Sequence, residues 1–231
     1  MKKIIFSLIC FLPLFTFSQE KTKSTGKTTI ERINVGAEVY QDFWMNWPKG
    51  MNVRGINQSG GGFITYSFPF KDDRFNFAIG LGVGFHNLFS NTYIKDIKAD
   101  TISFTVIPDS VNHKKIDYKK SKLSLVYLDV PLELRLKTKS KFVMSVGVKL
   151  GYLLDAKTKY KGDDLNGVAS SQITQKNRKV DNVNKFRFGP TIRIGYDWVQ
   201  VMGFFSVTQI FDKGNGPDLY PISVGITFTP F

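Results

Sequence analysis

The sequence predicts an all-β protein, a transmembrane antiparallel up-and-down β-barrel of about eight strands. Three observations predict it: an export leader, apolar residues at every second position over stretches of about ten residues, and connections that alternate between short and long. A helical membrane protein is not expected, because no stretch after the leader reaches the roughly 18 to 20 apolar residues of a spanning helix.

The start of the chain has the pattern of a secretory signal peptide. A positive charge at residues 2 and 3 precedes a mainly apolar stretch at 4–15, and the leader ends near Ser18, where we expect cleavage. The single cysteine, Cys10, lies inside the apolar stretch, so lipidation there is the alternative and the cleaved chain has no thiol. The predicted organisation is a signal peptide at 1–18, a short N-terminal segment at 19–31 and a barrel domain of the cell outer membrane at 32–231.

Alternation of apolar and polar residues marks the strands. Between Phe75 and Phe85, every second residue is apolar and large, and the residues between are Asn, Ala or Gly. Candidate strands lie at 32–45, 58–70, 75–88, 123–137, 142–155, 185–196, 200–211 and 221–230. The connections are short at 71–74, 138–140 and 197–198, and longer at 46–57, 89–122, 156–184 and 212–220. Short turns at one rim and long loops at the other are typical of outer-membrane barrels, with both termini at the short-turn rim.

The apolar rows are rich in Phe, Leu, Ile and Val, as a lipid-facing surface should be, whereas the opposite rows contain charges and glycines. A soluble lipocalin-like barrel with its charges outside is the alternative. In the membrane interpretation a charged network plugs the lumen, because an unpaired buried charge costs several kcal/mol. Its predicted members are Asp129, Glu133, Arg135, Lys149, Arg187 and Arg193.

Two hairpins have a register that the sequence suggests. Folding the chain about residues 139 and 140 sets Leu136 opposite Phe142 and Asp129 opposite Lys149, which predicts an ion pair between the last two. Folding about residues 72 and 73 predicts the pairs Phe68 with Phe77, Tyr66 with Ile79 and Ile64 with Leu81.

Aromatic residues gather near the predicted strand ends and suggest girdles at the lipid–water boundaries, although aromatic side chains favour strands in any case. The predicted girdle residues are Phe43, Trp44, Trp47, Phe85, Phe89, Tyr196 and Trp198.

No enzymatic activity is expected. His86, with Ser90 nearby in sequence, could imitate the site of a lipid A-modifying esterase or acyltransferase, but we interpret it as a rim histidine because no spacing here is specific. His113 lies in a polar loop and is expected to be solvated. Two histidines and no cysteine after cleavage predict no metal site and no cofactor.

The chain is strongly basic, with a formal charge of +13, which becomes +11 once Lys2 and Lys3 leave with the leader. Export argues against a nucleic-acid partner. We expect outer-membrane lipid and lipopolysaccharide as partners, and other envelope proteins through the long loops. The alternative is that the lysines only keep the loops soluble.

Four sequence motifs carry a family resemblance: Phe17-Ser18-Gln19 at the end of the leader, and strands at Tyr127–Leu134, Gly147–Tyr152 and Gly189–Gly195. Together they resemble the Bacteroidetes outer-membrane β-barrel family, often labelled PorT-like. The resemblance covers most of the mature chain and implies an eight-stranded barrel in the outer membrane. Its motifs are strand patterns, so the type IX secretion role known for one branch of the family is not transferred.

Three functions follow as hypotheses. The first is a structural or interaction barrel, an accessory of an envelope or secretion assembly that uses long surface loops and has a plugged lumen. The second is a narrow channel, which an interior filled by side chains argues against. The third is a lipid A-modifying enzyme that depends on His86.

Overall fold

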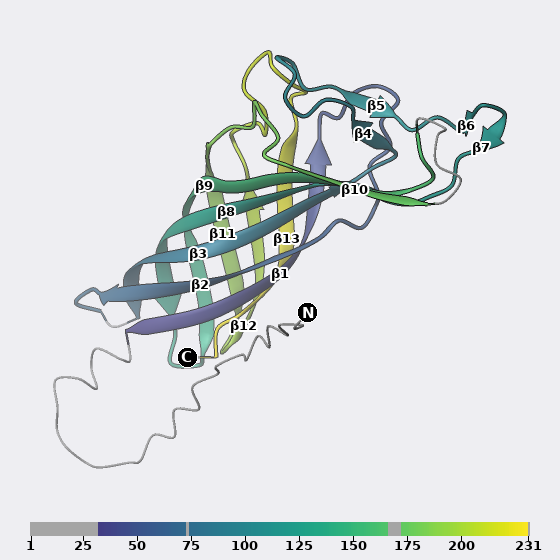
Figure 1. The fold of residues 1–231 in the computed structure, drawn as a ribbon. Helices are drawn as coiled ribbons and strands as arrows, with labels where there is room; N and C mark the ends of the chain where they lie inside the picture. Colours follow the sequence, from purple (N-terminus) through teal and green to yellow (C-terminus); the bar gives the residue numbers. More distant parts are fainter. Residues whose placement is uncertain (1–31, 73, 166–171, 231) are drawn as a thin grey trace, which may run out of the picture.

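The computed structural model describes residues 32–72, 74–165 and 172–230, and these residues form a closed antiparallel barrel (Figure 1). The predicted signal peptide and the segment at 19–31 lie outside the described residues. Within the described part of the chain, no helix is long and apolar enough to cross a membrane. The strands of the barrel are β1 (Ile33–Met45), β2 (Gln58–Pro69), β3 (Phe75–Phe89), β8 (Tyr118–Lys137), β9 (Phe142–Gly162), β11 (Phe186–Tyr196), β12 (Val199–Phe205) and β13 (Tyr220–Phe228).

These strands pair in the order β9-β11-β12-β13-β1-β2-β3-β8, and the pairing of β8 with β9 closes the ring. The sheet counts nine strands because β10 (Ile173–Arg178) adds to the upper part of β9 alone, which leaves eight in the ring. The predicted fold class is therefore confirmed, and each predicted strand corresponds to one in the ring. The largest boundary errors are in β9, which ends at Gly162 rather than near residue 155, and in β12, which ends at Phe205 rather than near residue 211.

Inward and outward side chains alternate along the strands of the ring, interrupted on β9 by a bulge at Leu154. On β1, Glu38 and Asp42 are buried, whereas Val35, Val39 and Phe43 are 44%, 63% and 51% exposed. An apolar outer surface around a polar interior is the arrangement of a barrel in lipid. The soluble lipocalin-like alternative is therefore wrong, because it requires the apolar row inside.

One of the two predicted hairpin registers is correct. The turn between β2 and β3 gives Phe68↔Phe77, Tyr66↔Ile79 and Ile64↔Leu81, as predicted.

The other register is wrong by two residues: Leu136 pairs with Met144, and Asp129 lies opposite Gly151. The turn is wider than a symmetrical fold about residues 139 and 140, because Thr138 pairs with Phe142 and the chain bends at Lys141, which has a φ of 63°.

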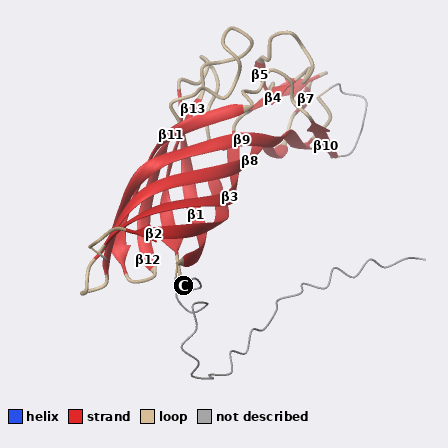
Figure 2. Cartoon of the chain, turned by 90° about the vertical axis from the view of Figure 1, so that its left-hand side faces the viewer, coloured by secondary structure: helices blue, strands red, loops and turns tan. Residues whose placement is uncertain are grey.

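The long connections gather at one end of the barrel and the short turns at the other (Figures 1 and 2). We call the described long-loop residues at 46–57, 90–117, 163–165, 179–185 and 206–219 the cap. Small strands lie within it: β4 (Thr92–Ile94) pairs with β5 (Phe104–Val106), and β6 (Ser110–Val111) with β7 (Lys114–Lys115).

The cap has an apolar core, which joins loop residues to the upper lumen-facing ends of the strands. Its buried members are Trp44, Met51, Leu88, Ile94, Ile102, Leu123, Leu125, Tyr127, Ala156, Val180, Val183, Ile210, Phe211 and Leu219. Backbone hydrogen bonds tie separate loops together, from Ile102 N to Asn215 O (2.8 Å) and from Asp181 N to Ile97 O (2.9 Å). The long loops therefore form a packed layer at the mouth of the barrel.

Candidate functional site

The candidate site is the lumen, where β1, β3, β8, β9 and β11 bring charged side chains together. The structure places all six predicted lumen residues on inward rows, and Asp129, Glu133, Lys149, Arg187 and Arg193 are each at most 6% exposed. The side chain of Arg135 is 11% exposed.

Asp129 pairs with Arg187, not with Lys149. The Arg187 Nη2 atom lies 2.9 and 3.0 Å from the two carboxylate oxygens of Asp129, and its guanidinium carbon lies 3.9 Å from the centre of the Tyr127 ring. The predicted Asp129–Lys149 pair is wrong because the register shift moves Lys149 along the strand to lie opposite Pro131. Lys149 instead donates to Glu38 at 3.2 Å.

Two glycines give the Asp129–Arg187 pair its space. A Cβ atom on Gly151 would lie 2.7 Å from both the Arg187 side chain and Asp129 Oδ1, and one on Gly84 would lie 2.6 Å from Asp129 Oδ2. Real Cβ atoms do not approach so closely, so these two positions require glycine while the pair is in place.

Arg193 lies at the centre of a second cluster, which is nearer the short-turn end of the barrel. Its guanidinium contacts Glu38, with Nη2 to Oε1 at 2.6 Å, and also Glu133. Arg135 donates to the other oxygen of Glu133 at 2.8 Å. Arg193 therefore holds two carboxylates, each of which has a second cationic partner.

The lumen charges balance. The four carboxylates are those of Glu38, Asp42, Asp129 and Glu133, and the four cations are Arg135, Lys149, Arg187 and Arg193. An uncompensated buried charge is costly, and the equal numbers of carboxylates and cations leave this set of lumen residues without net charge.

His86 belongs to this network and is not at the rim. It is 2% exposed, its Nδ1 lies 2.9 Å from Asp42 Oδ2, and its Nε2 lies 2.7 Å from Arg187 Nη1. A guanidinium can only donate, so Nε2 accepts and Nδ1 carries the proton that bonds Asp42. Asp42 also accepts hydrogen bonds from Ser59 and Ser223, each at 2.6 Å.

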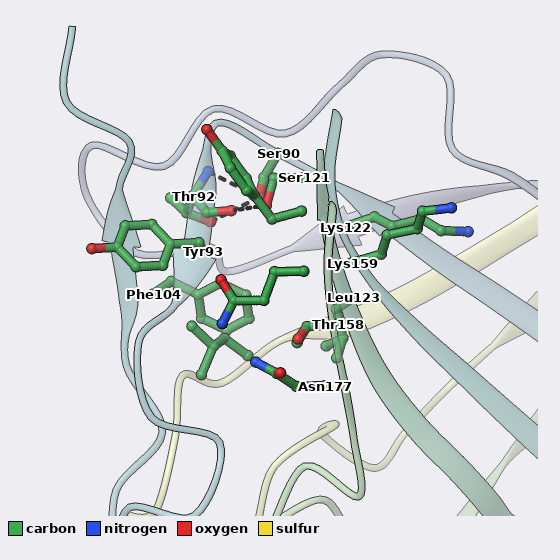
Figure 3. A pocket seen from close by; sticks show the side chains of 13 residues that line it. Ser90, Thr92, Tyr93, Phe104, Ser121, Lys122, Leu123, Thr158, Lys159 and Asn177 are labelled. Carbon is green, nitrogen blue, oxygen red and sulfur yellow. Dashed lines mark hydrogen bonds between the residues drawn. The ribbon is translucent and has the colours of Figure 1, made fainter. Parts of the chain in front are cut away.

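Ser90 does not join His86. Its hydroxyl bonds that of Thr92 at 2.7 Å and lines a cavity of about 20 Å³ in the cap, together with Ser121, Tyr93 and Phe104 (Figure 3). The described residues contain no cluster of His, Cys, Asp or Glu that could hold a metal ion. His113, in the cap, is exposed.

Little space remains around the central charges. A cavity of about 10 Å³ lies beside Glu38, Asp129, Lys149 and Arg193, and such a volume corresponds to about one water molecule. A wider hollow of about 240 Å³ opens at the short-turn end, where Arg135 and Arg193 form part of its lining.

Most of the predicted girdle residues are exposed on the outer surface. Of the predicted girdle residues, Phe43, Trp47, Phe85, Tyr196 and Trp198 are between 49% and 63% exposed, and Phe89 is partly exposed. Trp44 is wrong as a girdle residue: it is 3% exposed, and its indole N–H bonds the Asn87 carbonyl inside the mouth. Further exposed aromatics were not predicted: Phe68, Phe70, Phe75 and Phe142 near the short turns, Tyr152, Phe186 and Phe205 near the cap, and Phe188 on β11.

Four further lumen residues were not predicted: Glu38, Tyr40, Asp42 and His86. Strand parity could have found them. Val39 and Phe43 belong to the apolar row of β1, so Glu38, Tyr40, Asp42 and Trp44 must face inward.

A closed barrel of eight antiparallel strands, apolar outside and charged within, defines the class of outer-membrane β-barrel proteins. Residues 17–212 match the family described as outer membrane protein beta-barrel domain, and the chain belongs to this family. No curated protein matches the chain.

Solved structures similar to the chain include that of Ail, the attachment invasion locus protein of Yersinia pestis. It has 8% sequence identity and a TM-score of 0.36, covering 85% of this chain and 97% of that one. The complex of Ail with the heparin analogue sucrose octasulfate has 9% identity, a TM-score of 0.35 and the same coverage. A mutant of Rh. blastica porin has 9% identity and a TM-score of 0.23, covering 85% of this chain and 99% of that one.

Proposed function

We propose that this protein is a structural barrel that does not conduct, and that it anchors its cap at the cell surface for contact with other components of the envelope. The observation that carries the proposal is the balanced set of four carboxylates and four cations buried across the lumen. An ion that crosses the barrel would have to displace paired charges, and eight strands leave an interior that side chains can fill.

The cap supports the same proposal. Phe211, Leu219, Ile210 and Ile102 are at most 1% exposed and pack against strand residues of the mouth. A loop set with its own apolar core presents one fixed surface, as a binding partner requires, and it covers the end through which a solute would enter.

An enzymatic role has little support in this geometry. The Nε2 atom of His86, which would act as a base, accepts from Arg187, and Ser90 bonds Thr92 in the cap. A lipid substrate would have no route to a histidine that is 2% exposed. We infer that His86 orients Arg187 and Asp42.

We further infer that the chain is exported by a signal peptide cleaved near Ser18 and that it is related to the PorT-like barrels of Bacteroidetes. The strands at 127–134, 147–152 and 189–195 support the relation. An accessory role in an envelope or secretion assembly is consistent with a non-conducting barrel that carries a packed cap.

Conductance is the direct test. The purified mature protein is inserted into planar bilayers, and insertion is checked by heat-modifiable gel mobility. We expect no steady current from the wild-type protein. The variant Glu38→Ala with Arg193→Ala removes side chains of both charge signs from beside the cavity of about 10 Å³ and should admit small ions. Steady current from the wild-type protein would contradict the proposal and favour the channel hypothesis.

A further inference from the structure

Strands β8 and β9 continue beyond the barrel and, with β10, form a three-stranded extension beside the cap (Figure 1). One side of this extension is covered with cations, which we call the cationic face. Its members are Lys120 and Lys122 on β8, Lys157, Lys159 and Lys161 on β9, and Lys176 and Arg178 on β10.

The cations lie directly opposite one another across the strands. Lys159 pairs in register with Lys122 on one side and with Lys176 on the other. In the next rows Lys120 lies opposite Lys161, and Lys157 lies opposite Arg178. Like charges at opposed positions destabilise a sheet, so this arrangement has a cost that an anionic ligand would remove.

The electrostatics of the face show this repulsion. Partial burial and the neighbouring lysines lower the pKa of both Lys122 and Lys159 from the ordinary value. After burial, the largest contribution to the lowering of both pKa values comes from Lys120. Asp155 compensates part of the charge through an ion pair with Lys157 at 3.6 Å.

A β-bulge directs these lysines to the outer surface. Tyr127 pairs with Leu153 and Val126 pairs with Asp155, so Leu154 is an extra residue on β9. Below the bulge, the even-numbered residues of β9 face lipid, and above it the odd-numbered lysines take the outward positions. The cationic face is therefore the upward continuation of the lipid-facing wall.

The face adjoins the upper end of the apolar outer wall. Phe89 pairs in register with Lys122, whose Nζ lies 5.2 Å from the ring, and Leu154 just below Lys157 is 53% exposed. At about 3.3 Å per residue, the lysines from 157 to 161 begin roughly 10 Å along the strand from Leu154. Figure 3 shows Lys122 and Lys159 side by side, pointing away from the hydroxyl-lined cavity of the cap.

We propose that the cationic face binds the phosphate groups of phosphorylated glycolipid headgroups in the outer leaflet. The backbone positions that carry these lysines are about 5 Å apart across neighbouring strands and about 7 Å apart along one strand, so one headgroup with two phosphates can contact several lysines. The inference rests on the barrel lying in the outer membrane and not on its failure to conduct.

The test uses the mature protein in detergent with bisphosphorylated lipid A as the probe, and native mass spectrometry counts bound lipid. The test variant is Lys122→Gln, Lys159→Gln and Lys176→Gln. The matched control is Lys95→Gln, Lys98→Gln and Lys213→Gln, which removes the same charge from exposed positions of the cap. Each lysine near an anionic lipid surface raises the binding affinity about fivefold. The test variant should therefore bind lipid A about a hundredfold more weakly than the wild type, and the control should bind it as the wild type does.

Three further measurements separate the outcomes. Dephosphorylated lipid A should bind as weakly to the wild type as lipid A does to the test variant. Equal binding of both lipids, or an equal loss in the control, would overturn the proposal. Inorganic phosphate at millimolar concentration should not displace lipid A, and displacement would indicate a site for free anions. The conductance of the test variant should equal that of the wild type. A loss of lipid A binding can therefore be distinguished from a failure of the proposed non-conducting function.

Discussion

The Asp129–Arg187 pair makes a prediction about stability. The change Asp129→Asn keeps the shape of the side chain but leaves the Arg187 guanidinium buried without its carboxylate, against His86 and the Tyr127 ring. Breaking a buried pair from one side costs about 3 to 5 kcal/mol. At a denaturant dependence of about 2 kcal/mol per molar urea, the unfolding midpoint should fall by about 2 M.

A double-mutant cycle isolates the pair. Asp129→Asn with Arg187→Met removes both charges, so we expect it to recover about 2 kcal/mol or more of the loss. Unfolding is followed in lipid vesicles by tryptophan fluorescence and by heat-modifiable gel mobility. The matched control is Asp197→Asn, which breaks an exposed ion pair to Lys141 and should leave the midpoint unchanged. Additive effects of Asp129→Asn and Arg187→Met would refute the reasoning, since they would mean that each charge is solvated separately.

Three further predictions concern other parts of the molecule. Gly151→Val should lower stability by about 1 to 3 kcal/mol because its side chain would overlap the ion pair, whereas Gly203→Ala on the lipid-facing row should change little. Phe211→Ala removes a fully buried ring from the cap core, so trypsin added to whole cells should cut the loops faster, and unchanged cutting would contradict a packed cap. The pKa of Lys122 and of Lys159, lowered in the lipid-free protein, should rise when lipid A adds negative charge, and NMR of isotopically methylated lysines measures this; a fall would contradict phosphate contact.

Most of the barrel could be predicted because alternation in the sequence corresponds directly to the two faces of a strand. The register of the second long hairpin could not. A shift of two residues keeps every side chain on its face, so the predicted and observed pairings of Leu134 and Leu136 satisfy the pattern equally. The turn decides between them, through the hydrogen bonds of Thr138 and the left-handed conformation of Lys141.

For the candidate site, the sequence predicted which residues line the lumen better than it predicted which of them contact one another. Charged residues on inward rows are visible in the sequence, but which of them meet depends on how far each strand is staggered around the ring. Glu38 lies 111 positions from Lys149 and 155 from Arg193, and no local pattern links residues so far apart. The cap could not be predicted for a related reason. Its core joins a few isolated apolar residues from each of four separate loops to the strand ends.

The lumen network also constrains how the barrel can assemble. Glu38 is on the first strand to be synthesised, and it neutralises cations on β9 and β11, which emerge from the ribosome more than 100 residues later. A sheet that has not yet curled into a ring must carry these charges unpaired or keep them in water. Closure of the ring therefore coincides with neutralisation of these charges. A sheet that closed in the wrong register would leave the Glu38 carboxylate and its cationic partners unpaired. The ion pairs therefore favour the closed arrangement in which Glu38 meets both Lys149 and Arg193.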